Sequence, residues 1–377
     1  MRIGVPAETD PAETRVAATP ETVKKFIALG AEFVVEHGAG VKAGVPDADF
    51  SAAGAKIVDA AEALGADVVL KVRRPSPGET AALKSGALVV ATMDPYGHAD
   101  AIEAMGKAGV AAFAMELMPR ITRAQVMDVL SSQANLAGYR AVIDAAAEYG
   151  RALPMMMTPA GTVAAARAFI MGVGVAGLQA IATARRLGAI VTATDVRPAT
   201  KEQVESLGAK FVAVEDEEFK QAETGGGYAK EMSDAYKAKQ AALVASHIAK
   251  QDIVVTTALI PGRPAPKLVS ADMVRSMRAG SVIVDLAVER GGNCELAKAG
   301  ETVVTDNGVR IVGYSNVTRL AATASALYAR NLYAFVETLI DKDKKALAVN
   351  WDDELVKATA LTRDGAIVHP NFQPKPA

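Results

Sequence analysis

The sequence has 377 residues, roughly two and a half times an average domain of about 150 residues, so we expect two domains. Its 41 basic and 43 acidic side chains leave a formal net charge of −2, too little to attract nucleic acid or an anionic membrane. Hydrophobic residues make up 50% and charged residues 22% of the chain, which excludes a disordered protein. The single cysteine, Cys294, excludes an intrachain disulfide and suits a reducing cytoplasm.

The first 120 residues alternate short apolar runs, typical of strands, with Ala-rich stretches that are typical of helices. The helix expected at Pro20–Leu29 has Thr19 as an N-cap and ends at Gly30. Such alternation predicts a parallel sheet covered by helices on both faces. Further helices are expected at Asp59–Leu64 and Ala99–Ala108. Strands are expected at Arg2–Val5, Glu32–Val35, Lys56–Ile57, Val68–Val72, Leu88–Thr92 and Ala111–Ala114.

A long helical stretch, Ala124–Leu153, leads to a second alternating series, and another helical stretch runs from Leu320 to Ile340. We therefore predict an α/β fold of two Rossmann-like domains with parallel sheets flanking a cleft. Long helices join the domains, and the second is inserted into the first. The predicted domains are residues 1–132 with 320–377, and residues 133–319. Strands of the second are expected at Ala168–Met171, Ile190–Asp195, Phe211–Val214, Ile253–Thr256, Ser281–Leu286, Thr302–Thr305 and Arg310–Val312.

Residues 168–177 read AFIMGVGVAG and contain the G-x-G-x-x-G pattern of dinucleotide-binding turns. Gly172 would allow the tight turn, Gly174 would let a pyrophosphate approach the backbone, and Gly177 would let the following helix pack closely on the sheet. The helix N-terminus would offer N–H groups to phosphates. The alternative is a Gly-rich helix–sheet contact without a nucleotide. The residues expected to line the turn are Gly172, Val173, Gly174, Val175, Ala176 and Gly177.

This turn also explains the longest charge-free stretch, residues 168–184. It has 17 residues, whereas a membrane-spanning helix needs about 20. A buried strand followed by a helix accounts for the stretch better than a membrane span does.

Asp195 ends the next strand, 18 residues after Gly177. An acid at this place accepts hydrogen bonds from the adenosine ribose hydroxyls and repels a 2′-phosphate, which favours NAD over NADP. Val196 and Arg197 follow it. Arg197 leaves the specificity open, because an Arg beside this acid can hold a 2′-phosphate; the alternative is a solvated Arg before Pro198.

Two later loops are candidates for nucleotide contacts. Ala258 and Leu259 begin the loop ALIPGRPAP directly after a strand, at the sheet edge where ligands bind in such folds. Tyr228 lies in the segment Thr224–Tyr236, whose Gly-rich start is typical of a flap that closes on a ligand. The alternative for this segment is an ordinary exposed loop.

The segment Met115–Ser132 could form the opposite wall of a cleft. Gln125, Asp128 and Ser131 recur at steps of three or four, so one helix face could carry them, with Arg120 nearby. Together they offer the donors and acceptors that a carboxamide needs. The alternative is an amphipathic helix with a solvated polar face. No cluster of His or Cys indicates a metal site, and Cys294 is interpreted as a bystander thiol.

Several runs together resemble the NAD(H)-binding component, domain I, of proton-translocating NAD(P) transhydrogenase, a family that shares its fold with alanine dehydrogenase. They are MELMPRITRAQVMDVLSSQANLAGYRAVIDAA, GVGVAGLQAIATARRLGAIVTATDVR, VESLGAKF, ETGGGYAKEM, TTALIPGRPAP and SVIVDLAVERGGNC. The resemblance implies that NADH bound here passes its hydride to NADP⁺ on a partner component, coupled to proton translocation by membrane subunits. It also implies a homodimer, cytoplasmic and peripheral to the inner membrane through those subunits.

The resemblance also assigns roles to individual residues. Arg120, Asp128 and Ser131 would orient the carboxamide and ribose of NADH, Gln125 would reach toward NADP(H), and Tyr228 matches the Tyr of the family's mobile loop. All four residues of Met115–Ser132 would thus serve hydride transfer.

Alanine dehydrogenase is the alternative function. Its family pattern has a His after the strand that corresponds to Leu88–Thr92, whereas this sequence has Asp94 there and His98 displaced. Glu289 also replaces an Asp of that pattern. Arg15 and Lys71 nevertheless resemble the substrate anchors of the alanine enzyme. A third possibility, a non-catalytic NAD-sensing module, has no extra regulatory segment to support it.

Overall fold

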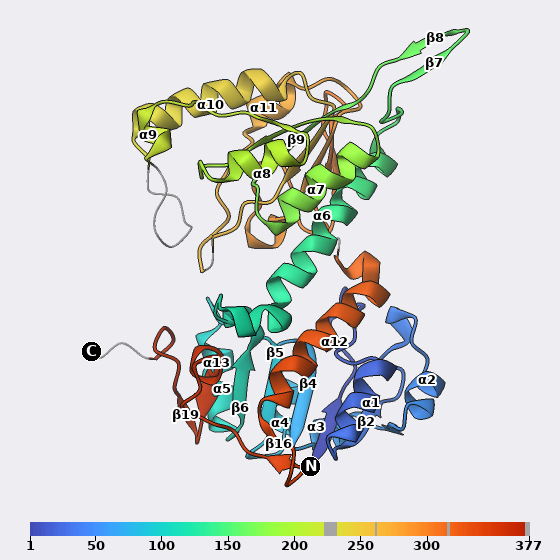
Figure 1. Ribbon diagram of the computed structural model, residues 1–377, viewed down its shortest axis with the longest axis vertical. Helices are drawn as coiled ribbons and strands as arrows, with labels where there is room; N and C mark the ends of the chain where they lie inside the picture. Colours follow the sequence, from blue (N-terminus) through green and yellow to red (C-terminus); the bar gives the residue numbers. More distant parts are fainter. Residues whose placement is uncertain (222–231, 261, 315–316, 374–377) are drawn as a thin grey trace. The chain divides into compact units, whose positions relative to one another are not determined.

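The computed structural model describes residues 1–221, 232–260, 262–314 and 317–373 (Figure 1). The chain divides into two compact units: unit 1 comprises Met1–Gln133 with Thr318–Ala377, and unit 2 comprises Ala134–Val317. The chain enters unit 2 within α6 (Val129–Glu148) and returns in η5 (Val317–Leu320), just before α12 (Ala321–Glu337). Both units combine sheets with helices, so the predicted α/β class is confirmed.

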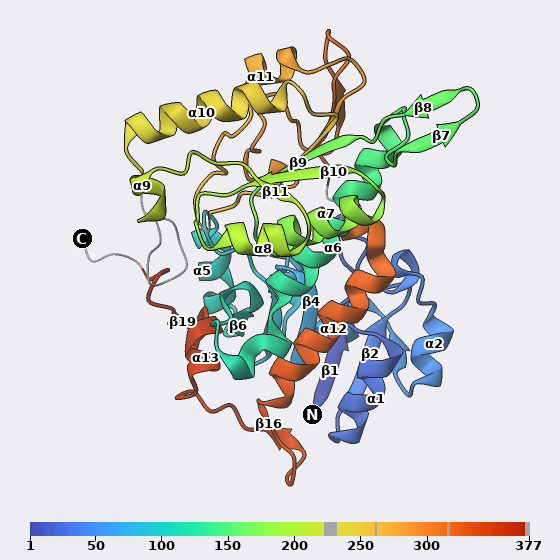
Figure 2. The ribbon, with the colours of Figure 1, turned by 45° about the horizontal axis from the view of Figure 1, so that its top comes forward.

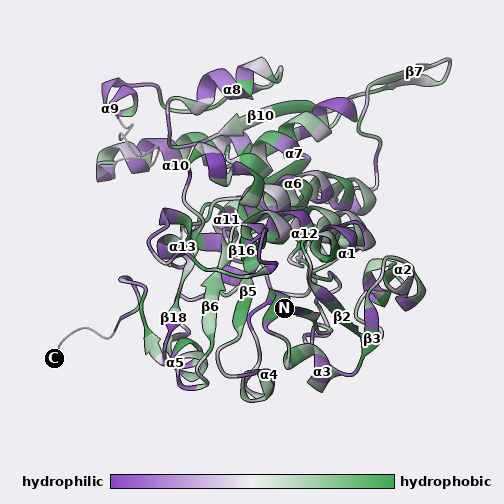
Figure 3. Ribbon diagram, turned by 60° about the horizontal axis from the view of Figure 1, so that its bottom comes forward, coloured by the Kyte–Doolittle hydropathy of each residue, from purple (hydrophilic) through white to green (hydrophobic). Residues whose placement is uncertain are grey.

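Unit 1 is built on a six-stranded parallel sheet in the order β3-β2-β1-β4-β5-β6. Its strands are nearly continuous apolar runs, as expected for a parallel sheet buried on both faces, and Figure 3 shows β5 in hydrophobic colours. The strands are β1 (Arg2–Val5), β2 (Glu32–Glu36), β3 (Lys56–Val58), β4 (Val68–Arg73), β5 (Leu88–Thr92) and β6 (Ala111–Ala114). The helices besides α12 are α1 (Pro20–Ala28), α2 (Asp47–Ala52), α3 (Ala60–Leu64), α4 (Pro77–Ala82), α5 (Ala99–Lys107) and α13 (Glu354–Thr359).

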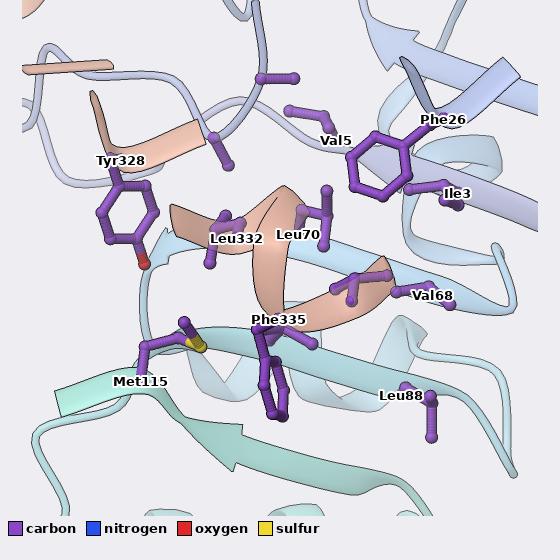
Figure 4. Close-up of a cluster of buried hydrophobic side chains, with 14 of the residues drawn as sticks. Ile3, Val5, Phe26, Val68, Leu70, Leu88, Met115, Tyr328, Leu332 and Phe335 are labelled. Carbon is purple, nitrogen blue, oxygen red and sulfur yellow. The ribbon is translucent and has the colours of Figure 1, made fainter. Parts of the chain in front are cut away.

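Helix α12 covers one face of this sheet with an apolar stripe. Tyr328, Leu332 and Phe335 are fully buried, at the spacing that places side chains on one helix face. Figure 4 shows Leu332 beside Leu70 of β4, and the ring centroids of Phe335 and Phe113 are 5.5 Å apart. Burying one such side chain contributes about 1.5–3 kcal/mol. This packing ties the C-terminal part of the chain to a sheet made by residues 2–114.

Unit 2 is built on a seven-stranded sheet in the order β11-β10-β9-β12-β13-β15-β14. Its edge strand β14 is antiparallel to β15, because residues 305–309 connect the two directly and are too few for a crossover. The chain order reverses between β9 and β12, and ligands of such sheets bind at the carboxyl ends of the strands at this point. The strands are β9 (Arg167–Met171), β10 (Ile190–Thr194), β11 (Lys210–Phe211), β12 (Ile253–Thr256), β13 (Val282–Asp285), β14 (Thr302–Val304) and β15 (Arg310–Val312).

The helices of unit 2 are α7 (Val175–Arg186), α8 (Thr200–Ser206), α9 (Glu217–Lys220), α10 (Asp234–Ile248) and α11 (Ala271–Ser276), besides most of α6. Among the residues that the structure describes, no helix combines the length and the apolar character needed to cross a membrane.

A hairpin of β7 (Met156–Thr158) and β8 (Gly161–Val163) was not expected from the sequence, where the segment reads as a cluster of turn residues. Figures 1 and 2 show it projecting away from the sheet of unit 2. All residues of both strands are exposed, and the side chain of Met157 is 76% exposed. An isolated hairpin of this kind is marginal in water.

Two predictions of the sequence analysis are wrong in detail. The long helix expected at Ala124–Leu153 is broken: η3 (Thr122–Met127) is a 3₁₀ turn, and α6 starts only after Asp128. The expected C-terminal tail instead contains α13 and two small hairpins, β16 (Ile340–Asp341) with β17 (Ala346–Leu347) and β18 (Thr362–Arg363) with β19 (Ala366–Ile367). The buried side chains of Leu355, Val356 and Leu361 hold this segment on unit 1.

Candidate nucleotide-binding site

The turn between β9 and α7 contains two glycines that the fold itself requires. Gly172 has φ +100°, and a Cβ there would lie 2.5 Å from Thr257 Oγ1. A Cβ on Gly177 would lie 1.9 Å from the Gly172 carbonyl oxygen. Real Cβ atoms do not approach carbonyl oxygens this closely, so the first turn of α7 can pack on β9 only without side chains at these two positions.

Gly174 is different, because its packing does not require a glycine. It is the N-cap of α7, with extended backbone angles (φ −80°, ψ −166°) that any residue adopts, and a Cβ there would meet no heavy atom of the described chain within 4 Å. No side chain of the described residues caps the helix N-terminus at this residue. The bare backbone therefore leaves the first N–H groups of α7 open to an anion, which fits a pyrophosphate.

A third close contact comes from a glycine that the sequence analysis did not single out. Gly138 lies in α6, and a Cβ there would lie 2.0 Å from the carbonyl oxygen of Ala176. Helix α6 therefore packs directly against the first turn of α7. A glycine inside a long helix, where it costs about 1 kcal/mol relative to Ala, was the available signal.

Asp195 follows β10 at the carboxyl edge of the sheet, beside the same turn. Its Oδ2 accepts a hydrogen bond from Val173 N at 2.7 Å. Its two oxygens also accept hydrogen bonds at 2.9 Å from Nε and Nη2 of Arg197. Arg197 is thus paired with Asp195, and the interpretation of Arg197 as a merely solvated side chain is wrong.

The loop after β12 is held in place by a buried amide. Ala258 N donates to Asn293 Oδ1 at 3.0 Å, and Asn293 Nδ2 donates to the carbonyl oxygens of Ala258 and Pro266. Asn293 is fully buried and was not identified from the sequence. The next side chain, Leu259, is exposed, as are those of Val175 and Val196 on the neighbouring segments.

Cys294 is a structural residue in the loop after β13. Its main-chain N–H donates to Asp285 Oδ2 at 2.8 Å, and the thiol is fully buried. Burial raises the pKa of this thiol to about 11. The thiol therefore stays protonated at neutral pH, as expected for a bystander.

The polar segment of unit 1 is arranged differently from the single helix face that the sequence suggested. Gln125 lies in η3, whereas Asp128 precedes α6 and caps it: its Oδ1 accepts from Ser131 N at 2.9 Å and its Oδ2 from Ser131 Oγ at 2.6 Å. Arg120 and Gln125 are exposed. The structure brings Asp128 and Ser131 together, and the cap is the reason for the break in the helix.

Asn331 of α12 holds this segment from behind. Its Nδ2 donates to the Val126 carbonyl oxygen at 2.7 Å, and its Oδ1 accepts from Ser132 Oγ at 2.7 Å. One nearly buried amide thus connects η3, α6 and α12. The sequence offered no signal for this role, since it depends on a helix about 200 residues away in the chain.

The two cations that resemble substrate anchors are neutralised inside unit 1. Arg15 donates through Nε and Nη2 to both oxygens of Glu13 at 2.7 Å, and Lys71 Nζ lies 2.7 Å from Glu79 and 3.3 Å from Glu8. Burial would raise the pKa of Glu13, but the hydrogen bonds and charge of Arg15 outweigh it and lower that pKa. At Glu8 burial prevails over Lys71 and raises the pKa.

The flap and the metal prediction stand as follows. Tyr228 lies outside the residues that the structure describes. In the described part of the chain, no group of three or more His, Cys, Asp or Glu side chains could hold a metal ion.

Comparison with known families identifies both parts of the chain. Residues 4–137 match the model "Alanine dehydrogenase/PNT, N-terminal domain", and residues 141–370 match "Alanine dehydrogenase/PNT, C-terminal domain". The chain belongs to the alanine dehydrogenase/PNT family.

Within this family the chain is similar to transhydrogenase subunits. It is 57% identical over 378 residues to the first of the chains that make up NAD(P) transhydrogenase subunit alpha of Rhodospirillum rubrum, covering 98% of both chains. A crystal structure of transhydrogenase from Sinorhizobium meliloti has 62% identity and a TM-score of 0.89, covering 98% of this chain and 100% of that one. The alanine dehydrogenase of Mycobacterium tuberculosis is 31% identical over 299 residues, 78% of this chain and 74% of that one.

Proposed function

We propose that the chain is the NAD(H)-binding component of a proton-translocating NAD(P) transhydrogenase. The observation that carries the proposal is the turn at Gly174, where the fold leaves room for a side chain and the sequence has none. Gly172 and Gly177 are explained by packing alone, so Gly174 is the position that points to a ligand. The similarity to transhydrogenase alpha subunits supports the same conclusion.

The nucleotide would lie along the carboxyl edge of the sheet in unit 2. The turn from Gly172 to Gly177 would hold the pyrophosphate, and Asp195 would accept hydrogen bonds from the adenosine ribose. The negative charge of Asp195 disfavours a 2′-phosphate, which supports NAD(H) rather than NADP(H) as the cofactor of this chain. The exposed side chains of Val175, Val196 and Leu259 and the backbone of Ala258 would flank the adenosine. Tyr228 remains a proposed contact.

When bound, NADH supplies a hydride, and the reaction between two nicotinamide rings needs no acid or base from this chain. The work of the protein is then proximity and orientation. The Asp128–Ser131 pair and Arg120 would hold the carboxamide and ribose of NADH. Exposed Gln125 would reach toward the NADP(H) that a partner component binds.

The pairing of Arg15 and Lys71 speaks against alanine as a substrate. A carboxylate-binding site needs a cation with an open side, but here Glu13 occupies the guanidinium of Arg15, and Glu8 and Glu79 contact the ammonium of Lys71. His98, the nearest candidate for proton transfer, has Nε2 at 3.4 Å from Asp94. Incubating the chain with alanine and NAD⁺ tests this directly: we expect no pyruvate, and robust formation of pyruvate would favour alanine dehydrogenase instead.

We further propose that the chain is a homodimer on the cytoplasmic side of the inner membrane, where membrane subunits of the enzyme hold it. The β7–β8 hairpin supports dimerisation, because Met155, Met156, Met157 and Val163 are all exposed there. A hollow of about 500 Å³ lies at its base, between Leu153, Pro154 and Leu187 among others. A second copy that exchanges hairpins would cover both surfaces, as a two-fold interface requires.

Two substitutions test the nucleotide and transfer roles separately. Asp195→Ala should weaken NADH binding, measured by the change in NADH fluorescence; an unaffected affinity would remove Asp195 from the site. Asp128→Asn should slow hydride transfer to an NADP⁺ analogue in single-turnover experiments with the partner component, while NADH affinity changes little. Unchanged transfer rates would contradict its role.

A further inference from the structure

The carboxylate of Asp195 is saturated with hydrogen-bond donors from its own chain. A carboxylate has about four lone-pair sites. Four N–H groups fill them: the main-chain N–H of Val173 at 2.7 Å, and the main-chain N–H, Nε and Nη2 of Arg197, each at 2.9 Å. The Asp195 side chain is only 6% exposed. Any further donor must therefore displace one of these four.

Two of the four donors are fixed and two are removable. The N–H groups of Val173 and Arg197 belong to the backbone of the two turns, so they cannot leave without unfolding them. The guanidinium of Arg197 is carried by a flexible side chain that is 31% exposed. Its two N–H groups contact different oxygens of Asp195, which is also how the two neighbouring hydroxyls of a ribose would pair with a carboxylate.

We propose that the Arg197 guanidinium is an internal substitute for the ribose diol, and that it must leave Asp195 when the adenosine ribose of NAD(H) binds. This inference rests on the proposed NAD(H) site. The exchange replaces two charged N–H donors by two O–H donors, so it costs part of the binding free energy. Arg197 is thus an affinity-determining residue that weakens nucleotide binding and favours release of the product nucleotide.

The test compares nucleotide affinity in the full chain and in Arg197→Ala. We expect the variant to bind NADH and 5′-AMP about two- to tenfold more tightly, the range for losing a partly exposed ion pair that competes with the ligand. With 2′-deoxy-5′-AMP, which lacks one of the competing hydroxyls, the gain should be smaller. Arg197→Lys should lie between the two, because an ammonium cannot occupy both oxygens as a fork does.

Arg310→Ala is the matched control. Arg310 also lies in unit 2 and pairs with a carboxylate, Glu148, at 2.9 Å, but it is not near the fingerprint residues in sequence. Its removal should leave all affinities unchanged. Titration calorimetry gives each affinity directly, and thermal unfolding shows whether each variant remains folded.

The outcomes are distinguishable. If the unaltered chain binds NADH and Arg197→Ala binds it no more tightly, the competition is refuted while the NAD(H) site stands. Weaker binding by Arg197→Ala also overturns the inference, because it would mean that the guanidinium contacts the nucleotide. If the unaltered chain binds neither NADH nor 5′-AMP, the proposed function fails, and this inference fails with it.

Discussion

Replacing each of two glycines by alanine separates what the fold requires from what a ligand requires. In Gly177→Ala the new Cβ would start 1.9 Å from the Gly172 carbonyl oxygen, so α7 must move away from β9. In Gly174→Ala the new Cβ meets no described protein atom within 4 Å, and the backbone angles suit alanine. The two substitutions add the same methyl group to the same turn, so each serves as the control for the other.

The expected magnitudes differ in kind. Overpacking of a tight contact costs about 1–3 kcal/mol, and the short distance at Gly177 places Gly177→Ala at the upper end or beyond. Gly174→Ala should change the free energy of unfolding by no more than about 0.5 kcal/mol, as for other substitutions without new contacts. If a pyrophosphate lies against the backbone at Gly174, however, the methyl group takes its place. The same penalty of about 1–3 kcal/mol then appears in binding, as an NADH affinity about 5- to 150-fold weaker.

Two assays suffice. Unfolding in denaturant gives the stability of each variant, and NADH fluorescence titration gives the affinity. The reasoning predicts that Gly174→Ala is stable and binds poorly, whereas Gly177→Ala is destabilised. A Gly174→Ala variant that binds NADH as tightly as the unaltered chain would refute the idea that a ligand approaches the backbone there.

Three further predictions concern the surroundings of the site. Asn331→Ala loses two hydrogen bonds of about 0.5–1.5 kcal/mol each, so we expect lower stability and slower hydride transfer with unchanged NADH affinity; an unchanged transfer rate would contradict the positioning role. Glu13→Gln should cost about 3 kcal/mol at pH 7, because it leaves buried Arg15 without a counter-charge. Since the folded-state pKa of Glu13 is lowered from 4.5, its contribution is complete above that pH and disappears as pH falls through the lowered value, so the difference in denaturation midpoints should shrink in acid. An equal difference at neutral and strongly acidic pH would argue against the charge pair. Cys294 should resist alkylation in mildly alkaline buffer until the chain unfolds, because burial raises its pKa to about 11; fast labelling of the native chain would show that the thiol is accessible.

The sequence predicts the parts of this protein that depend on local pattern. The strand before Gly172, the glycine spacing and the acid at Asp195 are all readable, because each part of a dinucleotide-binding turn has its own steric or charge requirement. Parallel strands such as Leu88–Thr92 and Ala111–Ala114 are readable for a similar reason, since a sheet buried on both faces needs continuous apolar runs.

Features that depend on side-chain pairing or distant contacts escape such reading. Periodicity extends the helix through Asp128, because it does not register that the carboxylate turns back to cap the next turn. The pairing of Arg197 with Asp195 and that of Arg15 with Glu13 are choices of rotamer. The role of Gly138 becomes visible only when Ala176 of another helix lies against it.

Transfer of an isotopic label tests the central claim most directly. NADH deuterated at the transferring position is mixed with this chain, the NADP(H)-binding partner component and NADP⁺ in ordinary water. Direct transfer predicts that the NADPH formed carries the deuterium, with no hydrogen taken from the solvent. Solvent hydrogen in the product, or no NADPH from a mixture that binds both nucleotides, would contradict the proposed function.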